Sequence, residues 1–240
     1  MADTAPVLIW MSGTDKLCSY FNKSWLDFTG RTMEQELGNG WAQGVHPDDL
    51  QRCLDVYAQS FDRRVQFSME YRLRHHDGGY HWILDNGVPR LNQDGSFAGY
   101  IGALVDITER KTAEESRLRL ATIVESSDDA IISKNLDGVI VSWNKGAQRI
   151  YGHAEAEAVG KPIAIIIPPE LIEEENKILE KLTAGGHIDH YETLRVTKTG
   201  KKINVSLTIS PIKDLTGTIV GAAHIARDIT ERKIAEKEAP

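Results

Sequence analysis

The chain has 240 residues, of which 41% are hydrophobic and 26% charged, a composition typical of a globular protein with one or two domains. Its formal net charge of -7 argues against binding to nucleic acid or anionic membranes, because both need a basic surface. No apolar run is long enough to span a membrane, no signal peptide is visible, and Cys18 and Cys53 are expected to be free thiols in a reducing cytoplasm.

The first part of the chain predicts strands followed by helices. Two short strands are expected at 8–10 and 18–20, on either side of a turn-like segment. A short helix follows near 24–29 and is closed by Gly30. A longer helix is expected to begin at Pro47, because proline suits a first turn and the two aspartates after it favour the positive end of the helix dipole.

Three further strands are predicted before residue 106. Residues 65–73 alternate between apolar and polar, which indicates a half-buried strand. An Asp-Gly-Gly turn joins it to a strand at 80–88, and an Asp-Gly turn joins that strand to one at 97–105. An antiparallel sheet with helices on one face leaves a hollow between them, which is a natural site for a small molecule.

The hexapeptide DITERK occurs at residues 106–111 and again at 228–233, an offset of 122 positions (228 − 106 = 122). The same offset relates Gly30 to Gly152 and many other glycines and prolines to a partner. Because these residues set the geometry of turns, matched glycines and prolines predict matched turns. We therefore expect two tandem copies of one domain.

The second copy repeats the elements of the first. A hairpin is predicted from the apolar runs at 130–133 and 139–143, and a short helix at Lys145–Tyr151 follows it. Residues 203–209 alternate as a strand. The predicted limits are 1–111 for the first domain, 112–122 for a linker helix, 123–233 for the second domain, and 234–240 for the start of an exit helix or tail.

This order of elements, together with several motifs, resembles a PAS domain in each half of the chain. The motifs of the first half are Asn-Lys at 22–23, HPDDL at 46–50, EYRLRHHDGGYHWI at 70–83 and GYIGALVDITERK at 99–111. Those of the second half are VSWNKGAQRIYGH at 141–153, GKPIAIIIPPE at 160–170 and GAAHIARDITERK at 221–233. The resemblance implies an α+β fold: two tandem PAS folds, each an antiparallel five-stranded sheet with short helices on one face, joined by a helix.

In the PAS family the Asp-Ile-Thr element ends the last strand and begins a helix that leads to the next module. The resemblance therefore assigns signal transfer to Asp106, Thr108, Arg110, Asp228, Thr230 and Arg232. Either Asp106 or Thr108 is expected to cap the first such helix. Ala113, Leu120 and Val124 lie near heptad spacing, so a short coiled-coil seam in a parallel or antiparallel homodimer is expected. The alternative is a capped linker helix without a signalling role.

The candidate pocket residues are Trp10, Phe21, Trp25, Tyr71, Trp82, Ile132, Trp143, Ile165, Val205, Leu207 and His224. In the first copy the large aromatic side chains are expected to fill the hollow, with a non-covalently bound flavin as the alternative. The aliphatic interior of the second copy is expected to be filled, or to form a slot for an apolar molecule. Family members with flavin photochemistry carry an Asn-Cys-Arg-type motif, and haem-binding members carry a helix histidine. The corresponding segments 41–45, 163–167 and 171–176 contain neither, so we expect neither haem nor a flavin adduct. Our first expectation is that the chain binds no cofactor.

The histidines offer few candidate sites, and no metal site is predicted. His75 and His76 are expected to be an exposed polar pair beside a turn, without a third ligand for a metal. His187 and His190 are expected to face solvent. His224 lies in an otherwise apolar strand, where it is either a satisfied structural residue or a ligand-binding or pH-sensing group.

The chain has no kinase, cyclic-dinucleotide or nucleotide-binding signature and no Ser/His/Asp grouping, so it is not expected to be an enzyme. We expect a cytoplasmic sensor that passes a ligand- or partner-induced change through its exit helices to an output domain, first of all that of a sensor histidine kinase. The resemblance also implies a homodimer and a downstream domain or partner protein, without nucleic acid or membrane. The alternative is a ligand-free PAS module for dimerisation and protein interaction.

Overall fold

A computed structural model describes residues 7–238, so the predictions that concern residues 1–6 and 239–240 lie outside the described residues. The chain divides into two compact units between Ser116 and Arg117. This division falls inside helix α4 (Thr108–Ser126), which extends beyond the predicted linker segment 112–122 at both ends. The predicted domain limits themselves stay a prediction.

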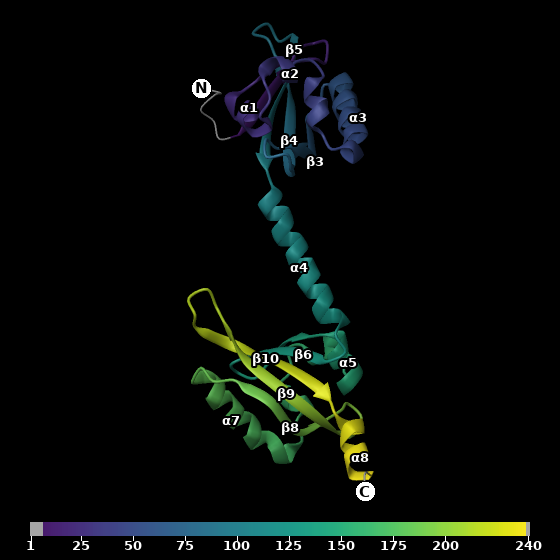
Figure 1. Cartoon of the computed structure of the whole chain (residues 1–240), viewed down its shortest axis with the longest axis vertical. Coiled ribbons are helices and arrows are strands. Elements are labelled where there is room, and N and C mark those ends of the chain that lie inside the picture. The colour runs from purple at the N-terminus through teal and green to yellow at the C-terminus, as the bar shows by residue number, and fades with distance from the viewer. Residues whose placement is uncertain (1–6, 239–240) are drawn as a thin grey trace. The chain divides into compact units, whose positions relative to one another are not determined.

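The first unit is a five-stranded antiparallel sheet with helices packed on it (Figure 1). Its strands are β1 (Leu8–Ser12), β2 (Cys18–Phe21), β3 (Phe67–Arg74), β4 (Tyr80–Leu91) and β5 (Phe97–Asp106). Its helices before α4 are α1 (Lys23–Thr29), α2 (Met33–Glu36), the 3-10 helix η2 (Gly40–Gly44) and α3 (Pro47–Arg63). The strand order is β2-β1-β5-β4-β3, so the last strand lies in the middle of the sheet.

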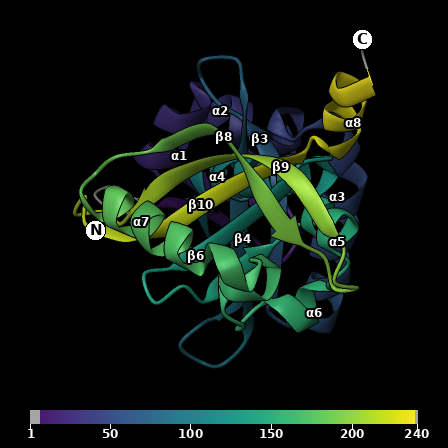
Figure 2. The same ribbon diagram turned by 90° about the horizontal axis from the view of Figure 1, so that it is seen from below.

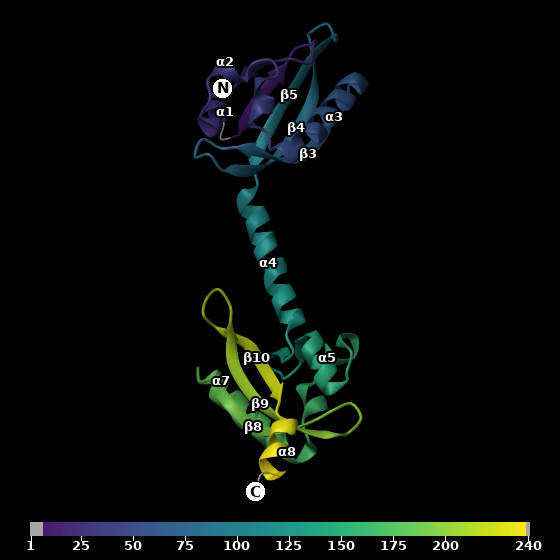
Figure 3. The ribbon, with the colours of Figure 1, turned by 45° about the vertical axis from the view of Figure 1, so that its right-hand side comes forward.

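The second unit has the same architecture, with the strand order β7-β6-β10-β9-β8. Its strands are β6 (Ala130–Asn135), β7 (Ile140–Trp143), β8 (Ile188–Val196), β9 (Lys202–Lys213) and β10 (Ile219–Asp228). Its helices are α5 (Lys145–Tyr151), α6 (Glu155–Ala158), the 3-10 helices η3 (Ile163–Ile166) and η4 (Pro169–Leu171), α7 (Ile172–Thr183) and α8 (Thr230–Glu238). Helix α7 runs along the sheet (Figure 2), and α8 continues from the end of β10 (Figure 3). The expected α+β fold of two five-stranded sheets is confirmed.

Matched asparagines begin the first helix of each unit. Oδ1 of Asn22 accepts hydrogen bonds from the amides of Trp25 at 3.1 Å and Ile9 at 2.9 Å. Oδ1 of Asn144 makes the corresponding two bonds, at 2.8 Å and 2.9 Å. Each asparagine therefore caps a helix and ties its start to the first strand of the sheet. Gly30 ends α1 in the left-handed region at φ 66°, as predicted.

Two details differ from the predicted elements. The one-turn helices between α1 and α3, and their counterparts after α5, were not predicted, because segments this short carry no full period of apolar residues. Strand β3 begins at Phe67 rather than Val65, because Val65 completes the end of α3 by donating its amide to Ser60 O at 3.1 Å. Among residues 7–238, no helix is both long and apolar enough to cross a membrane.

Glycines make room for aromatic side chains in the first sheet. The register pairs Trp10 on β1 with Gly102 on β5, and a Cβ at Gly102 would lie 2.1 Å from Trp10 Nε1. A Cβ at Gly87 would lie 2.3 Å from the ring of Phe67. In the second sheet His224 stands where Gly102 stands in the first, and it pairs with Ile132. The two units therefore share a backbone but fill the space over their sheets with different side chains.

Candidate functional site

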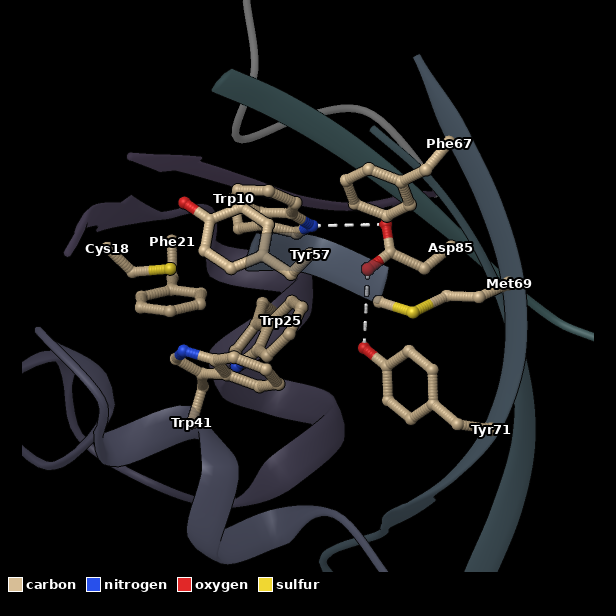
Figure 4. A pocket seen from close by; sticks show the side chains of 10 residues that line it. All are labelled: Trp10, Cys18, Phe21, Trp25, Trp41, Tyr57, Phe67, Met69, Tyr71 and Asp85. Atoms are coloured by element: carbon tan, nitrogen blue, oxygen red, sulfur yellow. Dashed lines mark hydrogen bonds between the residues drawn. The ribbon is translucent and has the colours of Figure 1, made fainter. Parts of the chain in front are cut away.

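The hollow of the first unit is lined almost entirely by aromatic and sulfur-containing side chains (Figure 4). The lining residues are Trp10, Cys18, Phe21, Trp25, Trp41, Tyr57, Phe67, Met69, Tyr71 and Asp85. They leave a free volume of about 10 Å³, which is room for about one water molecule. The side chains thus fill the hollow, and any larger ligand would have to displace them.

One carboxyl group stands among these rings. Asp85 is buried, and its Oδ1 accepts a hydrogen bond from Trp10 Nε1 at 3.1 Å (Figure 4). The hydroxyl of Tyr71 donates to Asp85 Oδ2 at 3.5 Å. Burial raises the pKa of Asp85 to about 7, although the bonds from Trp10 and Tyr71 act in the opposite direction. Asp85, the one carboxyl group among the residues that line this hollow, was not predicted as a pocket residue.

Four of the five pocket residues predicted in the first copy lie in this hollow: Trp10, Phe21, Trp25 and Tyr71. Trp82 does not, and its assignment was wrong. Its side chain is half-buried, and its ring faces two cations instead, with Arg72 Cζ 5.4 Å and Lys111 Nζ 5.3 Å from the ring centroid. On β4 the buried alternate positions are Ile83 and Asp85, so Trp82 belongs to the other face of the sheet.

The predicted pocket residues of the second copy lie in one core. Ile132, Trp143, Val205 and Leu207 are buried there, and Ile165 is partly buried against them. His224 is also buried, and its Nε2 has no hydrogen-bond partner among the described residues. Burial, with smaller contributions from Lys134 and Arg195, lowers the pKa of His224 to about 3. His224 therefore stays neutral near pH 7, which is contrary to a pH-sensing role. The alternative of a satisfied structural histidine does not hold at Nε2 among the described residues.

The interior of the second unit was expected to be aliphatic, but it also contains charged side chains. Lys134 and Arg195 are both buried in it. Two neighbouring glutamates on α7 meet them: Lys134 Nζ contacts Glu175, and Arg195 Nη1 donates to Glu174 Oε1 at 3.1 Å. Helix α7 is therefore held over the sheet by ion pairs as well as by apolar packing.

The end of β5 in the first unit is joined to α4 by a set of short contacts, which we call the strand–helix joint. Asp106 Oδ1 accepts a hydrogen bond from the amide of Thr108 at 2.8 Å, so Asp106 rather than Thr108 caps the start of the helix. The hydroxyl of Thr108 instead accepts from the amide of Trp82 on β4 at 2.9 Å. Glu70 on β3 forms ion pairs with Arg110 at 2.6 Å and with Lys111 Nζ at 2.5 Å.

The joint recurs in the second unit. The amide of Thr230 donates to Asp228 Oδ1 at 2.8 Å, and its hydroxyl accepts from the amide of Asn204 at 3.0 Å. Glu192 forms an ion pair with Arg232 and another with Lys233 Nζ at 2.5 Å. In each unit three strands thus contact the first turn of one helix. The matching offset of Glu70 and Glu192 was visible in the sequence, but their pairing with the hexapeptide was not predicted.

We expect Thr108→Val to loosen this joint. Valine keeps the shape of threonine but removes the oxygen that accepts the amide of Trp82, which costs about 1 kcal/mol. The amide of Trp82 should then exchange with solvent about fivefold faster, measured by hydrogen exchange. Thr112→Val is the matched control, because Thr112 Oγ1 bonds only to carbonyls of its own helix. Equal exchange of Trp82 in both variants would contradict the role given to Thr108.

The predictions for the histidines are confirmed at some positions and wrong at one. His187 and His190 are exposed, as expected. For the pair His75–His76, His76 is exposed as expected. The expectation is wrong for His75, which is half-buried and has ligand groups of Asp77 and His81 near its ring. The third ligand group comes from the opposite strand of the hairpin, where sequence spacing alone does not place it.

Comparison with known proteins gives two family matches. A model of the PAS fold matches residues 19–104, and a model of the PAS domain matches residues 128–231. The solved PAS domain of a Colwellia psychrerythraea protein has 29% identity and a TM-score of 0.45, and covers 48% of this chain and 97% of that one.

Three curated relatives are similar to part of the chain. The uncharacterised protein y4lL of Sinorhizobium fredii is 47% identical over 118 residues, 49% of this chain and 14% of its own length. The probable diguanylate cyclase DgcE of Escherichia coli is 26% identical over 202 residues, 80% of this chain and 18% of its own length. The two-component sensor PprA of Pseudomonas aeruginosa is 25% identical over 152 residues, 60% of this chain and 16% of its own length.

The matched segments thus span less than a fifth of the length of each of these curated relatives. The two family matches and the two five-stranded sheets agree on what the chain contains. The chain belongs to the PAS family and carries two PAS sensor domains in tandem.

Proposed function

We propose that this chain is a cytoplasmic signal-sensing and relay module, which passes a ligand- or partner-induced change through α4 and α8 to an output domain. The single observation that carries the proposal is the strand–helix joint, present in both domains with the same partners. Each joint ties three strands to a helix start, so a shift of the sheet changes the position of the helix. A relay needs such a shared element, whose two arrangements are favoured differently with and without the signal.

The output domain is proposed to be that of a sensor histidine kinase. One relative is a two-component sensor and another a probable diguanylate cyclase, and both are much longer than the segment that matches this chain. Their names support a sensor role upstream of an enzyme. They do not decide which enzyme, so a histidine kinase as the output domain is our proposal.

A second candidate function is supported by the filled hollow of the first domain. A free volume of about 10 Å³ favours a ligand-free relay or dimerisation domain over a flavin-binding one. We therefore propose no cofactor for this domain. An absorbance scan of the purified protein tests this point, because a bound flavin or haem would absorb visible light.

Dimerisation is proposed to use α4. None of its residues is buried within the chain, and Leu120 is 64% exposed. Ala113, Leu120 and Val124 lie on one side of this helix by their spacing, as in a short coiled-coil seam.

We expect Leu120→Glu to convert a dimer into a monomer, because it places a charge in that seam. Light scattering after size exclusion measures the change in mass. Leu118→Glu is the matched control: Leu118 is 69% exposed but lies off the seam, so this variant should remain a dimer. A wild-type monomer, or equal behaviour of the two variants, would contradict a seam on α4.

The relay is tested by joining the chain through α8 to a histidine kinase core and measuring autophosphorylation. Thr230→Val and Glu192→Gln break contacts of the second joint and should change the rate by about fivefold or more. Glu155→Gln removes an exposed carboxylate on α6 and should leave the rate unchanged. The relay proposal fails if both joint variants match the wild type while the fused kinase core remains active.

A further inference from the structure

Two histidines and a carboxylate meet beside the turn between β3 and β4. Ligand atoms of His75, Asp77 and His81 all lie within 4.8 Å of one another. Nδ1 of His75 is 3.2 Å from Oδ1 of Asp77, and Nε2 of His81 is 4.0 Å from Oδ2 of the same residue. In a tetrahedral Zn²⁺ site, ligand atoms about 2.0–2.2 Å from the ion lie about 3.3 Å from each other. Small side-chain movements would therefore bring the three groups onto one ion.

The two imidazole rings are held in place by their neighbours. The rings of His75 and His81 stack with centroids 4.3 Å apart, and the ring of Phe28 on α1 meets both edge-on, at 4.8 Å and 5.5 Å. The strand pairing of Leu73 with His81 brings the second histidine back beside the first. Asp77 is fixed by the amide of Gly79, which donates to its Oδ1 at 2.8 Å.

One atom of this cluster lacks a hydrogen bond. Nδ1 of His75 is buried and, although Asp77 Oδ1 lies 3.2 Å away, it makes no hydrogen bond to any described residue. A buried nitrogen of this kind is uncommon unless an ion or a water molecule meets it. The side chain of Asp77 is 55% exposed, so an ion can reach the cluster from solvent and keep water as a further ligand.

A second carboxylate orients one of the histidines. Oδ2 of Asp106 lies 2.7 Å from Nδ1 of His81. Because an ionised carboxylate only accepts hydrogen bonds, the proton of the neutral ring lies on Nδ1, and the lone pair of Nε2 faces Asp77. This carboxylate–histidine arrangement is the one that metal-binding histidines use to fix the ring and its tautomer.

We propose that His75, Asp77 and His81 bind one divalent transition-metal ion such as Zn²⁺, and that Asp106 passes the effect of binding to α4. Two imidazole nitrogens and one carboxylate oxygen suit Zn²⁺ and its neighbours better than Ca²⁺ or Mg²⁺. An ion on Nε2 makes the Nδ1 proton of His81 a stronger donor to Asp106. Asp106 also accepts from the amide of Thr108, so the ion acts on the first turn of the helix. This coupling rests on the proposed relay function, whereas the binding site does not.

The second domain offers an internal control. Its residues at the positions of His75, Asp77 and His81 are Thr197, Thr199 and Ile203, which lack ligand groups of this kind. Its joint nevertheless keeps Asp228, which accepts from the amide of Thr230 at 2.8 Å. Zn²⁺ should therefore affect the first joint and leave the second unchanged.

Calorimetric titration of the whole chain with Zn²⁺ tests the site. We expect one ion per chain, loss of binding in His75→Gln and His81→Gln, and about 10–100-fold weaker binding in Asp106→Asn. His190→Gln is the matched control, because His190 Nε2 lies 3.6 Å from Asp189 Oδ1 in a pair that is not part of a three-ligand cluster among the described residues. The site is disproved if the wild type takes up no Zn²⁺, or if His190→Gln weakens binding as much as His81→Gln.

Measurements on the wild-type chain test the site even if a variant fails to fold. Zn²⁺ should shift the nitrogen resonances of His75 and His81, and unshifted resonances overturn the site. Zn²⁺ should also slow hydrogen exchange of the Thr108 amide but not of the Thr230 amide. Binding without any change at Thr108 would refute the coupling alone, and the kinase fusion tests the relay independently of Zn²⁺.

Discussion

Asp85→Asn is expected to stabilise the first PAS domain at pH 8 by up to about 4 kcal/mol and to leave its stability nearly unchanged at pH 4. The carboxyl group is buried among aromatic rings, and burial raises its pKa from 3.8 to about 7. Asparagine has the same shape, keeps an oxygen for Trp10 Nε1 and carries no charge. It therefore removes the cost of a buried carboxylate without opening a cavity.

The sign of the pH dependence follows from the two protonation states. Between pH 4 and pH 7 the unfolded chain has lost the proton of Asp85 while the folded domain keeps it, so the wild type loses stability as the pH rises through this range. Below pH 4 both states are protonated, and above pH 7 both are charged, so the difference between wild type and Asp85→Asn becomes constant.

Chemical unfolding at several pH values, followed by tryptophan fluorescence, measures this difference. Four of the five tryptophans, Trp10, Trp25, Trp41 and Trp82, belong to the first domain, so the signal reports mainly on that domain. Asp55→Asn on α3 is the matched control, because Asp55 is exposed and its replacement should not alter the pH profile. Parallel profiles for wild type and Asp85→Asn would show that folding does not shift the pKa of Asp85, which would contradict this prediction.

The elements that the sequence predicted well are those that depend on local chemistry. Asn22 caps α1, Gly30 ends it and Pro47 begins α3, and each of these acts within a few residues of its own position. The duplicated hexapeptide located the two joints for the same reason. Local signals of this kind need no knowledge of which strands are neighbours.

The features that were missed depend on strand pairing and on which face of a sheet is buried. Trp82 was expected to face the hollow, whereas the buried positions on β4 are Ile83 and Asp85. The partner of His75 comes from across a hairpin. Lys134 and His224 come together because β6 and β10 are paired, although their sequence positions lie far apart. A prediction from one sequence fixes none of these registers.

Glu175→Leu is expected to destabilise the second domain by about 3–5 kcal/mol, because it leaves the buried ammonium of Lys134 without its partner. The side chain of Lys134 is 1% exposed and that of Glu175 is 13% exposed. Lys134→Met should cost less, since Glu175 lies nearer to solvent and can recover part of its hydration.

The double variant Lys134→Met, Glu175→Leu decides whether this ion pair stabilises the domain. It removes both charges and leaves apolar groups against a groove that already contains Ile163, Ile167 and Leu179. Its stability should be equal to that of the wild type or higher, so the coupling energy should be large and opposite in sign to the two single effects. Chemical unfolding of the four proteins completes the cycle, and Glu173→Leu on the exposed side of α7 is the control for helix propensity.

A double variant as unstable as Glu175→Leu alone would mean that α7 depends on the charges themselves. The pair Lys134–Glu175 would then be a specific contact that holds α7 against β6, and a signal that separates the two residues would release the helix. If the double variant is stable, apolar packing of Ile178 and Leu182 holds α7 and the ion pair only sets its position. The two outcomes assign opposite roles to the ion pair in any movement of the second domain, because only in the first does α7 lose its hold on the sheet when both charges are removed together.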